Sequence, residues 1–300
     1  MPKGKLLNKN STIGIISPAS PSPKILIDKF ISDFRNLGFK IKLGNCLYEE
    51  NNYLTGSDKN RAKEIMDMFE DQSIDGIVSF RGGFGSIRTL PYLDINKIKR
   101  NPKFFCGFSD LTVLLNYFSN NGLITFHGPM IKSNFNEIIT KTYFERILTS
   151  PSKGLIYDIL GYNECNRCFS GYIKGGNLAM ICSTLGTPYE PNFDNSILIL
   201  EEINEPPYCI DRLLTQLTLS NKLNKCNGII LGHFTDCIDE KIDSNSLIAM
   251  IKKRLSSLNI PIVSALPFGH DYPNVTIPIG AYAHYDNKSN KLVICENVLK

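Results

Sequence analysis

The first half of the chain alternates short apolar runs with segments of helical periodicity. The apolar runs at residues 12–17, 39–43 and 75–80 have the length of buried strands. Between them, apolar side chains recur at helical spacing over residues 25–37 and again after Ser57, which is typical of helices with one buried face. This succession predicts a parallel sheet with helices on both faces and a ligand site beyond the carboxyl ends of the strands.

The second half repeats the alternation after a loosely patterned stretch. From about residue 132 to residue 167 the chain is polar, carries Asn and Lys side chains and shows weak periodicity, which predicts a crossover between two domains at about 136–168. Apolar runs then alternate with helical patterns as far as residue 265. Short alternating runs at 275–279, 281–285 and 292–294 are typical of β-hairpins.

The length of 300 residues agrees with two domains of about 150 residues each. We therefore expect an α/β protein with a parallel-sheet domain over 1–135, a crossover at 136–168 and a mixed α/β domain with β-hairpins over 169–300. The net charge of +4 is small against 33 basic and 29 acidic side chains, so neither nucleic acid nor a membrane is expected as a partner. The sequence has no signal-peptide core and no long apolar segment, which predicts a cytoplasmic protein.

The nine cysteines are dispersed along the chain, and we expect them to be reduced thiols. Cys165 and Cys168 form a single CxxC pair, and metal or redox use of this pair is the alternative interpretation. Because a zinc site usually needs two such pairs, we expect no metal site and no other cofactor.

One stretch of the first half places a serine between a strand and a helix. An apolar run reaches Gly107 and helical periodicity begins at Leu111, so Ser109 falls on the turn between them. Such a turn lifts the hydroxyl clear of the sheet and leaves the backbone N–H of Asp110 near the same space, where it can stabilise an oxyanion. The alternative interpretation is that Ser109 caps the N-terminus of the helix.

A glycine-rich turn, RGGFGS at residues 81–86, follows the preceding predicted strand. The turn lacks the GxGxxG spacing and the Lys-Ser/Thr pair of a P-loop, which argues against a nucleotide site. It has two further interpretations, a plain tight turn or a second source of oxyanion donors. In the latter case, the glycines let the backbone approach a substrate carbonyl closely and donate an N–H group to it.

One histidine and one glutamate stand where they could assist a nucleophile. His270 lies in a predicted loop, and Glu201 follows four aliphatic residues of a predicted strand. A carboxylate in so apolar a place needs a partner, and an imidazolium is a suitable one. A histidine considered by itself is more often a hydrogen-bonded structural residue than a catalytic one, and this alternative applies to all four histidines. Ser109, Glu201 and His270 nevertheless follow the chain order of the triad in α/β-hydrolases.

Five groups of motifs resemble those of the murein tetrapeptide LD-carboxypeptidases, a family of serine peptidases whose relatives include the microcin C immunity proteins. The resemblance extends from about residue 12 to residue 286. The motifs are RGGFG at 81–85, GFSD at 107–110, GGNL at 175–178, LEE at 200–202 with EPPY at 205–208 and IDR at 210–212, and PFGH at 267–270 with PN at 273–274.

The resemblance implies a Ser-His-Glu triad divided between a Rossmann-like N-terminal domain and a C-terminal domain. By position, Ser109 matches the nucleophile, His270 the general base and Glu201 the orienting carboxylate. Glu202 stands where the family has Asp. Because adjacent residues of a strand point to opposite faces, only one of the two glutamates can serve His270, and we favour Glu201.

The remaining site residues are also implied by the resemblance. The oxyanion donors would be the backbone N–H groups of Asp110 and of Gly82 or Gly83. Arg81 is a candidate for binding the free carboxylate of the substrate, and a structural ion pair is its alternative role.

The activity implied is release of the terminal D-alanine from murein tetrapeptides during peptidoglycan recycling, by a cytoplasmic homodimer. Two other functions remain open. An immunity-type enzyme would hydrolyse peptidyl or aminoacyl adenylates, but that branch is associated with an aromatic loop that stacks on the nucleobase, and this chain has no Trp. A non-catalytic two-domain binding protein would keep the fold without needing Ser109, Glu201 and His270 together.

Overall fold

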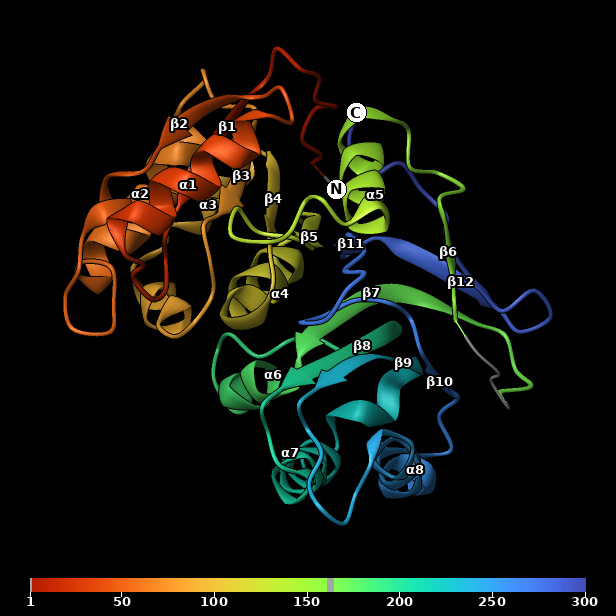
Figure 1. The fold of residues 1–300 in the computed structure, drawn as a ribbon. Helices are drawn as coiled ribbons and strands as arrows, with labels where there is room; N and C mark the ends of the chain where they lie inside the picture. Colours follow the sequence, from red (N-terminus) through yellow and green to blue (C-terminus); the bar gives the residue numbers. More distant parts are fainter. Residues whose placement is uncertain (1, 161–164) are drawn as a thin grey trace. The chain divides into compact units, whose positions relative to one another are not determined.

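The computed structural model describes residues 2–160 and 165–300, and the chain forms two compact units (Figure 1). The first unit comprises Met1–Ser152, Val275–Ile279 and Asn297–Lys300, and the second comprises Lys153–Asn274 and Gly280–Glu296. Two C-terminal segments therefore belong to the first unit. Among the described residues, no helix combines the length and the apolar character that a bilayer crossing requires.

The stretch 136–168 contains regular structure despite its weak periodicity. Helix α5 (Ile138–Thr149) belongs to the first unit and strand β6 (Ile156–Asp158) to the second, while residues 161–164 lie outside the described residues. The Glu137 carboxylate caps α5 by accepting hydrogen bonds from the first N–H groups of the helix, at 3.0 and 2.7 Å. The Glu137 cap therefore indicates the start of a helix that the weak apolar periodicity does not predict.

A six-stranded sheet forms the centre of the first unit, in the order β11-β5-β4-β3-β1-β2. Its five N-terminal strands are parallel, as the alternation of strands and helices predicts. The interior strands β3 and β4 are buried at every position, which is typical of a sheet covered on both faces. The strands are β1 (Thr12–Ile16), β2 (Lys40–Leu43), β3 (Gly76–Ser79), β4 (Phe104–Gly107), β5 (Thr125–His127) and β11 (Ile277–Ile279).

Helices connect these strands. Ser57, the residue before the second predicted helix, is its N-cap, because the Ser57 side chain accepts a hydrogen bond from the N–H of Asn60 at 3.2 Å. The α-helices are α1 (Lys24–Arg35), α2 (Asp58–Glu70), α3 (Ile95–Arg100), α4 (Thr112–Asn120) and α5. Three 3₁₀ turns, η1 (Asn45–Tyr48), η2 (Ser86–Tyr92) and η3 (Ser109–Leu111), complete the connections.

The C-terminal strands differ from the prediction in one respect. Strands β12 (Tyr282–Asp286) and β13 (Lys291–Ile294) form the expected antiparallel hairpin, but β11 does not join them. It pairs antiparallel with β5 in the first unit, with Ile277 opposite His127. β11 is an edge strand, the position that accommodates its proline, and its two isoleucines are buried there.

The two ends of the chain also meet in the first unit. The N–H of Leu6 donates to the carbonyl of Lys300 at 2.7 Å, and the N–H of Lys300 donates to the carbonyl of Gly4 at 2.9 Å. The first unit is therefore built from the beginning of the chain and from its last residues.

A seven-stranded mixed sheet forms the second unit, in the order β10-β9-β8-β7-β12-β13-β6. The strands from β7 to β10 are parallel, and the hairpin and β6 continue the sheet antiparallel. The strands not yet defined are β7 (Phe169–Asn177), β8 (Ser196–Ile203), β9 (Cys226–Thr235) and β10 (Ile262–Ser264).

Three helices cover one face of the parallel strands β8 and β9 (Figure 1). They are α6 (Leu178–Thr184), α7 (Pro207–Leu219) and α8 (Ser244–Leu255), with 3₁₀ turns η4 (Lys222–Lys225) and η5 (Ser256–Leu258) beside them. Alternate strand residues such as Leu198 and Leu200 pack with Leu214, Leu217 and Ile251 of the helices in one apolar core. This core fixes the end of β8, where the two glutamates stand.

Candidate active site

Ser109 occupies a strained turn at the carboxyl end of β4. Its φ of 62° lies in the left-handed region, which residues other than glycine rarely adopt. The 3₁₀ turn η3 begins at Ser109, and the N-cap of α4 is Leu111, without a capping hydrogen bond from a side chain. The interpretation of Ser109 as a helix cap is therefore wrong. Its backbone instead has the sharp strand-to-helix conformation that exposes the nucleophile in α/β-hydrolases.

The glycine turn approaches this serine so closely that a side chain would not fit. A Cβ atom on Gly82 would lie 2.9 Å from the Cβ of Ser109, 3.1 Å from its Oγ and 3.4 Å from the backbone nitrogen of Asp110. The Gly82 backbone, the Asp110 nitrogen and the serine hydroxyl therefore border one small space. Backbone nitrogens beside a hydroxyl are the arrangement that stabilises an oxyanion when that hydroxyl attacks a carbonyl.

The next residues of the turn lie against the loop that follows β1. Gly83 has a φ of 122°, and a Cβ atom there would overlap the Ser20 hydroxyl. The N–H of Phe84 donates to the same hydroxyl at 3.1 Å, and Arg81 Nη1 donates to the carbonyl of Pro21 at 2.9 Å. Arg81, the candidate for binding a substrate carboxylate, thus has a structural contact as well.

The side chain of Asp110 faces away from solvent and holds the far end of the glycine turn. Its carboxylate accepts hydrogen bonds from the N–H groups of Gly85, at 3.3 Å, and Ser86, at 2.8 Å. Burial raises the pKa of this carboxyl above its ordinary range. Asp110 therefore contributes a backbone nitrogen beside the serine and a side chain that binds the turn.

In the second unit, the adjacent glutamates at the end of β8 have different partners. Glu201 is fully buried, and its Oε2 lies 2.7 Å from His270 Nδ1. Glu202 instead accepts hydrogen bonds from Asn177 Nδ2 at 2.6 Å and from the N–H of Ala179 at 2.7 Å. It also accepts one from the N–H of Ile203, the next residue, at 2.9 Å. Glu201 thus contacts the histidine, whereas Glu202 binds the N-terminus of α6.

The loop that carries His270 packs closely against the Glu201 side chain. Gly269 has a φ of 120°, and a Cβ atom there would lie 2.9 Å from Glu201 Oε2. The N–H of Gly269 also donates to Asn274 Oδ1 at 3.2 Å. A carboxylate at Nδ1 favours the tautomer that has its proton on Nδ1 and its basic lone pair on Nε2. This is the state that a general base requires.

The described residues contain no group of three or more His, Cys, Asp or Glu side chains that could hold a metal ion. The nine cysteines lie among the described residues and form no disulfide there. In the CxxC pair, Cys168 Sγ contacts Asn287 Oδ1 at 2.8 Å, and Cys165 Sγ contacts the carbonyl of Arg167 at 3.3 Å. These contacts are those of ordinary polar thiols.

The sequence pattern did not reveal two side chains that shape the glycine turn, those of Asp110 and Arg61. Arg61 is fully buried in α2 and donates to the carbonyl of Gly85 at 2.9 Å. One signal was available, because Arg61 and Glu64 stand among apolar residues on the buried face of α2. A charged side chain in an apolar stripe needs a polar partner in the core.

The comparisons with known proteins cover both units. A family model described as the LD-carboxypeptidase N-terminal domain matches residues 13–128, and one described as the LD-carboxypeptidase C-terminal domain matches residues 170–284. The chain is 33% identical to the probable murein peptide carboxypeptidase of Bacillus subtilis strain 168, over 97% of this chain and 94% of that protein.

Two solved structures resemble the whole chain. The muramoyltetrapeptide carboxypeptidase from Oxalobacter formigenes has a TM-score of 0.83 and 30% identity, over 94% of this chain and 97% of that one. The microcin C7 self-immunity protein MccF in its wild-type apo state has a TM-score of 0.88 and 26% identity, over 100% of both chains. The same fold therefore occurs in a muramoyltetrapeptide carboxypeptidase and in a self-immunity protein.

Proposed function

Because this chain belongs to the LD-carboxypeptidase family, we propose that it is a serine-type carboxypeptidase that releases the terminal D-alanine of murein tetrapeptides. The observation that carries the chemistry is the 2.7 Å contact between Glu201 Oε2 and His270 Nδ1, which gives the second unit an oriented base. The strained Ser109 of the first unit supplies a suitable nucleophile. The names of the Bacillus subtilis and Oxalobacter formigenes proteins support the substrate class.

The proposed reaction is acyl transfer in two steps. His270 Nε2 takes the proton of Ser109 while the serine oxygen attacks the carbonyl of the L-centre residue that precedes D-alanine. The oxyanion receives hydrogen bonds from the backbone N–H of Asp110 and of Gly82 or Gly83. The C–N bond then breaks, D-alanine leaves with the proton from His270, and water repeats the sequence on the acyl-enzyme.

The proposal includes the surroundings of the reaction. Arg81 would bind the free carboxylate of D-alanine with the donors that its contact to Pro21 leaves available. The reaction would serve peptidoglycan recycling in the cytoplasm, and the family resemblance favours a homodimer.

A second candidate function is hydrolysis of peptidyl or aminoacyl adenylates. The observation in its favour is the likeness to MccF over the full length of both chains. MccF has also been solved in complex with aspartyl sulfamoyl adenosine, and that structure has a TM-score of 0.88 to this chain. The lack of Trp in this chain reduces the aromatic surface available to stack on a nucleobase.

Incubation with a defined murein tetrapeptide, followed by mass spectrometry, tests the proposal. We expect loss of one D-alanine, no loss with Ser109→Ala, and the same activity in EDTA. The C-terminal amide and an all-L peptide should be spared. Equal cleavage of these two peptides would indicate a general hydrolase. Cleavage of an aspartyl adenylate in place of the tetrapeptide would support the second function, and no cleavage of any of them would favour a binding protein.

A further inference from the structure

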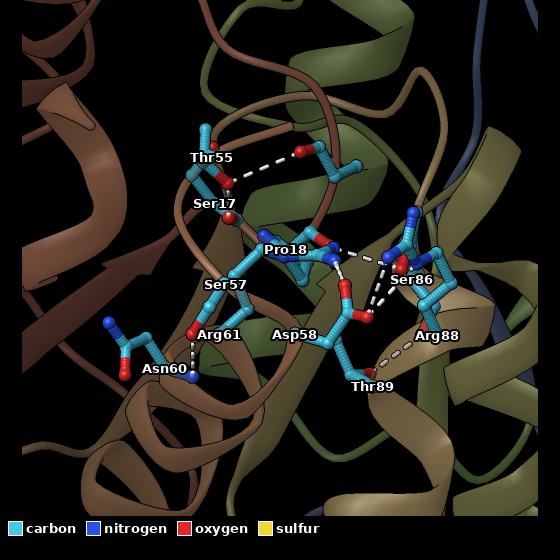
Figure 2. A network of polar contacts seen from close by, with 12 residues as sticks. Ser17, Pro18, Thr55, Ser57, Asp58, Asn60, Arg61, Ser86, Arg88 and Thr89 are labelled. Atoms are coloured by element: carbon cyan, nitrogen blue, oxygen red, sulfur yellow. Dashed lines mark hydrogen bonds and ion pairs between the residues drawn. The ribbon is translucent and has the colours of Figure 1, made fainter. Parts of the chain in front are cut away.

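A buried arginine joins the loops that surround Ser109. Arg61 has no solvent exposure, and its Nη1 donates to two backbone carbonyls, those of Pro18 after β1 and Gly85 after β3, the latter at 2.9 Å. Its Nη2 contacts the carboxylate of Asp58, one turn earlier in α2. Figure 2 shows the guanidinium between Pro18 and Asp58. One planar group thus fixes two loop ends that lie far apart in the sequence.

The loop after β1 is held from a second direction. Thr55 Oγ1 donates to the carbonyl of Ser17 (Figure 2). The N–H of Thr55 donates to the carbonyl of Ala19 at 3.1 Å. This loop in turn contacts the glycine turn, because the Ser20 hydroxyl accepts from the N–H of Phe84 at 3.1 Å. The position of the turn therefore depends on Arg61 both directly and through the neighbouring loop.

Asp110 binds the same glycine from the other side. The carbonyl of Gly85 accepts from Arg61, and its N–H donates to the Asp110 carboxylate at 3.3 Å. Gly85 has a φ of 124°, and a Cβ atom there would lie 2.8 Å from Arg61 Nη1 and 2.5 Å from Leu54 Cδ2. Buried charged side chains thus bind both the carbonyl and the N–H of Gly85. A residue with a Cβ atom would not fit at this position.

We propose that Arg61 and the Asp110 carboxylate are positioning residues, which clamp Gly85 and thereby hold the backbone N–H groups of the glycine turn at the distance from Ser109 that an oxyanion requires. The proposal rests on the proposed function, because it assigns these residues a part in stabilising the transition state of acyl transfer. Their side chains would act through the backbone and would not touch the substrate.

The chemistry of the clamp favours this role over a purely stabilising one. Burying an arginine and a carboxylate costs desolvation energy, and apolar residues of similar size often stabilise a fold as well or better. What apolar residues cannot supply is directed donors for two carbonyls and the two acceptor oxygens of one carboxylate for two N–H groups. Donors that stabilise an oxyanion must be fixed before the reaction, because donors that reorient during the reaction contribute less.

Two variants test the clamp, and the chain offers a matched control. Arg61→Lys keeps the charge but loses the planar fork, and Asp110→Asn keeps the shape but loses one acceptor. Arg88→Lys is the control, because the Arg88 side chain is exposed and binds the same Asp58 carboxylate, at 2.9 Å (Figure 2). Each variant is assayed for kcat and KM with the murein tetrapeptide, well below its melting temperature.

We expect kcat to fall by about 10- to 100-fold in Arg61→Lys and in Asp110→Asn, with KM changed by less than about two-fold, because the oxyanion forms only in the transition state. Arg88→Lys should keep the kcat of the wild type. Calorimetry on a Ser109→Ala background should show that both clamp variants bind the uncleaved tetrapeptide as tightly as their parent. A merely structural role would not separate kcat from binding in this way.

Folded clamp variants with the kcat of the wild type would overturn the inference and leave the proposed function standing. So would a loss of kcat that follows only the fraction of unfolded protein. If neither variant folds, the clamp is a determinant of folding and the inference is wrong. A wild type that releases no D-alanine contradicts the proposed function itself, and the inference then falls with it.

Discussion

Glu201 and Glu202 are neighbours in one strand, yet their carboxyl groups contact different parts of the second unit. Glu201 reaches His270, and Glu202 accepts three hydrogen bonds, two of them from backbone N–H groups. Burial raises the pKa of Glu202, although these hydrogen bonds favour its charged form. The two residues should therefore affect different measured quantities.

Substituting each glutamate by glutamine separates the two roles. Glu201→Gln should lower kcat, because the amide no longer stabilises an imidazolium, while the loss stays smaller than that of Ser109→Ala. Glu202→Gln should leave kcat nearly unchanged but lower the free energy of unfolding by about 1–2 kcal/mol, because an amide nitrogen cannot accept from the N–H of Ala179. Steady-state kinetics and urea unfolding measure the two effects. A larger loss of kcat at Glu202 would refute the assignment.

Part of this detail was accessible from the sequence. The alternation of side chains along a strand predicts that only one of the two glutamates serves His270, and four preceding aliphatic residues predict that Glu201 needs a partner. The contact between Asp110 and Gly85 was not accessible, because it depends on the positive φ of a glycine 25 residues away in the sequence. A sequence pattern identifies the residues of a turn but not the side chains that fasten it.

At the scale of single elements, the turn between β4 and α4 stores backbone strain at Ser109. The left-handed conformation costs a residue with a Cβ atom about 1–2 kcal/mol, and glycine avoids that cost at the expense of about 0.5–1 kcal/mol of chain entropy. Ser109→Gly should therefore be more stable than Ser109→Ala by about 0.5–1 kcal/mol, and both should be inactive. Thermal melting of the two variants makes the comparison. Equal or reversed melting temperatures would show that the turn is relaxed.

Strand β7 carries a buried lysine that makes stability depend on pH. Lys174 is 7% exposed, and burial lowers its pKa from 10.5 to about 8. Between these values the unfolded chain binds a proton that the folded protein lacks, so this group makes the folded state more stable as pH rises. Below about pH 8 both states are protonated, and the cost of a buried charge is present in full.

Lys174→Met removes this dependence. We subtract the free energy of unfolding of the wild type from that of the variant at each pH. This difference should be larger at pH 7 than at pH 10, by up to about 2–3 kcal/mol. Urea unfolding at several pH values measures it, and Lys40→Met, at an exposed position of β2, is the control. A difference between variant and wild type that stays constant from pH 7 to pH 10 would contradict the argument.

The elements themselves were largely predictable, and the exceptions have physical reasons. Strands β1 to β4 and helices α1, α2 and α4 follow apolar patterns whose periods differ between strand and helix. Helix α5 was not predicted, because its periodicity is weak and its first turn depends on the Glu137 cap. Strand β11 was predicted as a strand but given the wrong partner, because periodicity contains no information on which distant edge accepts a short apolar segment.

For the whole molecule, the proposed triad draws on both units. Ser109 belongs to the first unit and the Glu201–His270 pair to the second. Ser109→Ala and His270→Ala should each lower kcat by several orders of magnitude, and the double variant should lose little more, because the members of a triad act as one device. Single-turnover kinetics measure losses of this size. Losses that multiply in the double variant would show that the two residues act independently.

The position of Val275–Ile279 and Asn297–Lys300 in the first unit has a consequence for synthesis on the ribosome. Chains emerge from their N-terminus, and domains commonly fold in that order as they appear. Here the edge strand beside β5 and the partner of Gly4 are translated only after nearly all of the second unit. Until then, the edge of β5 that pairs with β11 stays unpaired in the nascent first unit. Folding of the first unit is completed only after translation of the second unit.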